Sequence, residues 1–105
     1  PKLNEVLEDD EPNIRWDSAI ALAKMGEESS VPIIENLMDR EYLMTFPELD
    51  YKEINKVIMT AIETSSLVLD NRFEPRLVEL ARSDESLTVR DAAIKTLKKS
   101  YDRII

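Results

Sequence analysis

The sequence predicts an all-α protein, a right-handed α-solenoid of antiparallel helix pairs with about two and a half repeats. Apolar residues recur at helical spacing along most of the 105 residues, and no segment shows the sustained alternation of a strand. A two-helix pattern at residues 10–39 returns in altered form downstream. Ile14, Ile54 and Val89 mark its successive copies, about 35 to 40 residues apart. Repeats of this length, which cannot bury their apolar faces alone, are typical of an α-solenoid.

The first repeat contains a helix over residues 12–25 and a second helix from Val31. Gly26, the single glycine of the chain, follows the first helix, where a left-handed C-terminal cap is favourable. Pro32 lies in the first turn of the second helix, where no backbone donor is needed, and no stop signal precedes Tyr42. Residues 1–7 and 75–81 share the pattern of this second helix.

Two further first helices are expected downstream. One begins after Asp50, which has Glu53 at capping-box spacing, and continues to about residue 69. The other begins after Asp84 or Ser86 and carries Ile94 on its apolar stripe. Between them, a helix that begins near residue 71 repeats the second-helix pattern.

The connection at residues 40–49 is the main irregularity, because it is roughly eight or nine residues longer than its counterparts. Loops are normally polar, yet residues 42–49 are mostly apolar. We expect this insert to bind a partner protein, since aromatic side chains contribute much of the energy at interfaces. The alternative is that these side chains fold back and serve only as core. The candidate protein-binding residues are Tyr42, Leu43, Met44 and Phe46, with Trp16, which aligns with polar residues in the other units and is expected to be partly exposed.

Residues 84–93, and approximately residues 10–18, resemble the repeat pattern of the HEAT-repeat family, including its bacterial lyase-like branch. The resemblance implies a protein-binding scaffold without catalytic activity. It also implies that Arg15 and Arg90 donate hydrogen bonds to aspartates in the turns, a ladder that Asn55 interrupts. Some relatives attach bilins, so the alternative function is a bilin-lyase-like pocket protein or chaperone subunit.

Composition excludes several classes of function. The chain has no His and no Cys, so catalytic triads and most zinc sites are absent, and we expect neither catalysis nor a cofactor. A net charge of −8, with 13 acids and 4 bases in residues 1–50, opposes nucleic-acid binding. The acidic run at residues 8–11 lacks the spacing of a calcium loop and is expected to be a solvated turn. No run approaches the roughly 18 apolar residues of a membrane span, and a cytoplasmic location is expected.

Residues 1–105 are expected to form one HEAT-like domain from a longer protein, because the repeats are fractional at both ends. Solenoids need polar capping units, and neither end has one. We therefore expect self-association through the apolar end residues Leu3, Val6, Leu7, Ile104 and Ile105.

The missing Cys and His ligands lead to a first prediction. The far-ultraviolet circular dichroism spectrum should be almost wholly helical, and a chelator should leave both the spectrum and the melting curve unchanged. A substantial strand signal, or unfolding on chelation, would contradict the helical, metal-independent fold.

Overall fold

The computed structural model describes residues 12–104, and only the backbone within residues 12–15. Over this range the chain is all-α, as predicted, and contains no strand. The elements are α2 (Pro12–Lys24), η1 (Glu28–Ser30), α3 (Val31–Leu37), α4 (Arg40–Leu43), α5 (Tyr51–Val68), η2 (Asn71–Phe73), α6 (Glu74–Ser83) and α7 (Leu87–Ser100). The acidic run at residues 8–11, the Arg15 side chain and the end residues Leu3, Val6, Leu7 and Ile105 lie outside the described residues.

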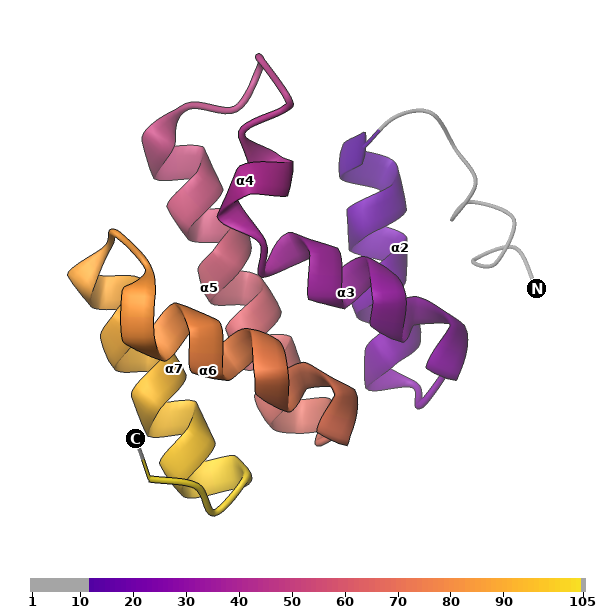
Figure 1. Ribbon diagram of the computed structural model, residues 1–105. Helices are drawn as coiled ribbons and strands as arrows, with labels where there is room; N and C mark the ends of the chain where they lie inside the picture. Colours follow the sequence, from indigo (N-terminus) through magenta and orange to yellow (C-terminus); the bar gives the residue numbers. More distant parts are fainter. Residues whose placement is uncertain (1–11, 105) are drawn as a thin grey trace.

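The helices form two layers (Figure 1). Helices α2, α5 and α7 lie side by side, since α5 contacts both of the others. Helices α3 and α6 cross in front of them, where α3 packs on α2 and α5 and α6 packs most extensively on α7. The described Cα atoms span 38 × 31 × 15 Å, and the short dimension fits two layers of helix.

Local sequence signals set most of the helix ends. Gly26 adopts a positive φ of 84°, and the amide of Glu27 donates to the carbonyl of Leu22 at 2.9 Å, the bond of a Schellman cap. Asp50 and Glu53 form the predicted capping box at the start of α5. The choice between two caps for α7 is resolved, because the Ser86 hydroxyl accepts from the Val89 amide.

The C-terminal ends of α5 and α7 are joined by a hydrogen bond. The Tyr101 hydroxyl donates to the Ser65 carbonyl at 2.7 Å. Burial, with the negative charges of Asp70 and Glu74, raises the pKa of Tyr101 to about 12. Tyr101 is therefore a neutral donor at physiological pH.

Two details of the helix prediction are wrong. The second helix does not continue toward Tyr42, because α3 ends at Leu37 and the Asp39 carboxylate accepts from the Tyr42 amide as the N-cap of a new helix, α4. Ile94, expected on the buried stripe of α7, is 38% exposed, because α7 lies at the edge of its layer (Figure 1).

The insert packs against the core through aromatic contacts. Trp16 is only 4% exposed, contrary to the expected partial exposure, because the Phe46 ring covers it edge-on at a centroid distance of 5.3 Å. The Tyr42 ring meets Phe46 at the same distance. Leu43 is fully buried. These contacts favour the alternative in which the insert folds back on its own chain.

Removal of the central ring of this cluster should destabilise the fold. Phe46→Ala loses contacts with both Trp16 and Tyr42, and because Phe46 is only partly buried we expect a loss of about 2–3 kcal/mol in the free energy of unfolding. Met44→Ala, at a 63% exposed position of the same insert, should change it by less than about 0.5 kcal/mol. Denaturant titration of both variants measures the difference. Equal stabilities would mean that the insert does not contribute to the core.

Candidate functional site

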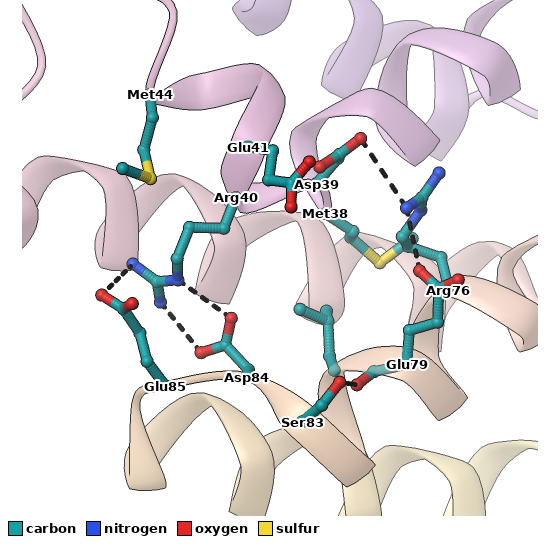
Figure 2. Close-up of a pocket in the computed structure, with 11 residues that line it drawn as sticks. Met38, Asp39, Arg40, Glu41, Met44, Arg76, Glu79, Ser83, Asp84 and Glu85 are labelled. Carbon is teal, nitrogen blue, oxygen red and sulfur yellow. Dashed lines mark hydrogen bonds and ion pairs between the residues drawn. The ribbon is translucent and has the colours of Figure 1, made fainter.

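A groove of about 650 Å³ lies between α4 and α6 and extends to the turn before α7 (Figure 2). Two of its residues, Met38 and Leu80, are buried core residues. Charged side chains from both helices and the turn surround them, and both signs of charge are present. The lining residues are Met38, Asp39, Arg40, Glu41, Met44, Arg76, Glu79, Leu80, Ser83, Asp84 and Glu85.

Arg40 and Asp84 form a bidentate ion pair across the groove (Figure 2). Arg40 Nε and Nη2 each donate to one carboxylate oxygen of Asp84 at 2.9 Å. The side chains are 10% and 3% exposed. This paired geometry is the strongest arrangement for an arginine and a carboxylate, and it joins residues 44 positions apart.

Further contacts hold both partners of this pair. Arg40 Nη2 also donates to Asn55 Oδ1 at 2.6 Å, and the guanidinium lies 5.4 Å from the centroid of the Tyr51 ring. Asp84 Oδ2 accepts from the Ser86 amide at 3.0 Å. The hydrogen bond from Arg40 to Asp84 raises the pKa of Arg40, so the guanidinium is always charged.

This pair differs from the ladder that the family resemblance implies. Arg90 was expected to bond an aspartate in a turn, but the guanidinium that donates to Asp84 is that of Arg40. Arg90 Nε is buried without a hydrogen-bond partner among the described residues. The physical reason is the insert, which brings Arg40 to the turn before α7. Asn55, at the ladder position of the middle unit, accepts from the same arginine.

A second set of ion pairs lies at the other end of the groove. Arg76 Nη1 is 3.7 Å from Asp39 and 3.0 Å from Glu79 (Figure 2). Its guanidinium is therefore shared between α6 and the residue that caps α4. An ion pair therefore connects the two sides of the groove at each end.

The groove contains more negative than positive charge. Five carboxylates and two guanidinium groups line it, a surplus of three negative charges. Neither His nor Cys occurs in the chain, and no three metal-ligating side chains cluster among residues 12–104. The groove offers a ligand charged side chains of both signs beside the exposed side chain of Met44.

The residues predicted for protein binding fall into two groups. Met44 is exposed and lines the groove. Trp16, Tyr42, Leu43 and Phe46 pack in or against the core and lie outside the groove lining. Trp16 instead borders a smaller hollow of about 190 Å³ between α2 and α5.

The roles of Arg40 and Asp84 were not found from the sequence. The available signal was the combination of an asparagine at a ladder position with an arginine at the start of the insert.

Comparisons with family models, curated proteins and solved structures found no match. None of the described helices is long and apolar enough to cross a bilayer.

A double-mutant cycle should reveal strong coupling between the two partners. Arg40→Ala and Asp84→Ala should each cost about 3 kcal/mol of unfolding free energy, because each leaves a buried charge unpaired, whereas the double variant should cost clearly less than their sum. Arg40→Lys should recover little, since an ammonium cannot reproduce the bidentate geometry.

The matched control is Lys95→Ala, which removes an exposed ion pair with Asp91. It should cost about 0.5 kcal/mol or less. Urea unfolding measures all five variants. Strictly additive losses for Arg40 and Asp84 would show that the pair contributes nothing beyond its separate residues.

Proposed function

We propose that this chain is a HEAT-like repeat scaffold, a right-handed solenoid without catalytic activity, and that it binds another protein at the groove between α4 and α6. The repeat pattern and the two-layer arrangement of the helices support the architecture. The observation that carries the binding role is the groove itself, which combines an exposed methionine with charged side chains held in place.

Pre-ordered side chains favour binding because little entropy remains to be lost on association. Arg40 and Arg76 are fixed by ion pairs at the two ends of the groove. Near Arg40, Met44 offers an accessible thioether, which can adapt its shape to an apolar partner side chain (Figure 2). Such a surface suits a segment of a partner protein.

The residues that line the groove favour a protein as the ligand over the two alternatives, a bilin-type ligand and a nucleic acid. A bilin-type ligand is largely apolar and would favour an enclosed apolar pocket, whereas seven of the eleven lining residues here are charged. Phosphates of a nucleic acid would meet the surplus of carboxylates. The proposed partner is therefore a protein, met in the cytoplasm and away from the membrane.

Affinity capture with two methionine variants tests this proposal. Met44→Lys places a positive charge in the groove, and Met25→Lys makes the same change at a 70% exposed methionine outside it. The tagged chain should retain a protein from a lysate of the source cells, Met44→Lys should lose at least about nine-tenths of it, and Met25→Lys should retain it.

Mass spectrometry measures the retained protein, and absorbance between about 350 and 700 nm detects any co-purified tetrapyrrole. Equal retention by Met44→Lys and the unmodified chain would refute the groove as the binding site. Tetrapyrrole absorbance in place of a protein partner would support the bilin-binding alternative.

A further inference from the structure

We propose that the partner segment bound in this groove is basic, an extended or helical stretch in which lysines or arginines flank an apolar side chain. This inference rests on the proposed function and adds the chemical class of the partner. It follows from which charged side chains of the groove already form ion pairs within the chain and which do not.

Both arginines of the groove are already engaged by its acids. Arg40 is held by both oxygens of Asp84 and by Asn55, which leaves little capacity for a ligand anion. Arg76 lies between Asp39 and Glu79. An acidic segment would have to displace these internal partners.

Three carboxylates of the groove are accessible, including Glu79, which also pairs with Arg76. Glu85 is 3.9 Å from the nearest nitrogen of Arg40, at the limit of an ion pair, and its side chain is 60% exposed. Glu79 is 67% exposed beside Arg76. Glu41 is also exposed and has no ion pair among the described residues. These three side chains offer negative charge from α4, from α6 and from the turn that follows α6, so a cation in the groove would be attracted from several sides.

The apolar part of the groove suits the stems of basic side chains. Met44 lies on the α4 side of the groove, at the end where Arg40 and Glu85 lie, and Glu79 lies toward the opposite end (Figure 2). Lysine and arginine bury their methylene stems on apolar surface while the charged group remains at a polar rim. A flexible thioether accommodates either stem, or a neighbouring apolar residue.

Fluorescence anisotropy with labelled twelve-residue peptides tests the inference. The peptides share length and leucine positions, and their other positions are all Lys, all Ser or all Glu. The Lys peptide should bind more tightly than the Ser peptide by about tenfold or more, with an affinity that falls as salt is raised, and the Glu peptide should not bind measurably.

A matched pair of triple variants separates groove binding from attraction to the net charge of −8. Glu41→Gln, Glu79→Gln and Glu85→Gln together should weaken Lys-peptide binding by about tenfold. Glu27→Gln, Glu48→Gln and Glu63→Gln together remove the same charge from exposed positions outside the groove and should weaken it less than about twofold. Thermal unfolding by circular dichroism shows that both triple variants are folded.

Three outcomes would overturn the inference: equal weakening by the two triple variants, equal binding of the Lys and Glu peptides, or no peptide binding at low salt. The proposed function fails separately, when protein capture does not depend on Met44. Capture that depends on Met44, combined with no preference for the Lys peptide, would keep the scaffold and reject a basic partner.

Discussion

The buried guanidinium of Arg40 joins separate parts of this structure. A charge that is 10% exposed is costly unless it is paired, and its partners come from two separate elements: Asn55 in α5 and Asp84 in the turn before α7. Because Arg40 itself belongs to α4, one side chain ties three parts of the fold together. A small shift of any of them would break the bidentate geometry and leave buried charge unmatched.

The opposite side of the insert is held by apolar contacts. Leu43 is fully buried, and the Phe46 ring lies between those of Trp16 and Tyr42. The insert is therefore fixed by a polar contact toward the α6–α7 turn and by aromatic packing toward α2. Ordering a loop costs conformational entropy. Because the insert that forms one side of the groove is already ordered in the folded chain, this cost is met during folding and not on binding.

Local signals account for what the sequence could predict. Helical periodicity, Gly26 and the Asp50–Glu53 box act within a few residues, and they place α2 and α5 nearly as observed. The burial of Trp16 was missed, because aligning repeats assumes that equivalent positions have equivalent surroundings, and only one unit carries an insert. The pairing of Arg40 with Asp84 joins positions 44 residues apart, for which a single sequence holds no local signal.

Asn55 and the insert are best understood as one departure from the repeat pattern. The implied ladder would place an arginine at position 55, but Asn55 Oδ1 lies 2.6 Å from Arg40 Nη2. A second guanidinium there would set two positive charges together where little water reaches them. An insert that brings Arg40 to this place therefore disfavours a second arginine at position 55, and Asn55 supplies a hydrogen-bond acceptor there instead. Within this pairing the charges of Arg40 and Asp84 cancel. The surplus of three negative charges in the groove therefore comes from its other charged residues, four carboxylates against the single guanidinium of Arg76.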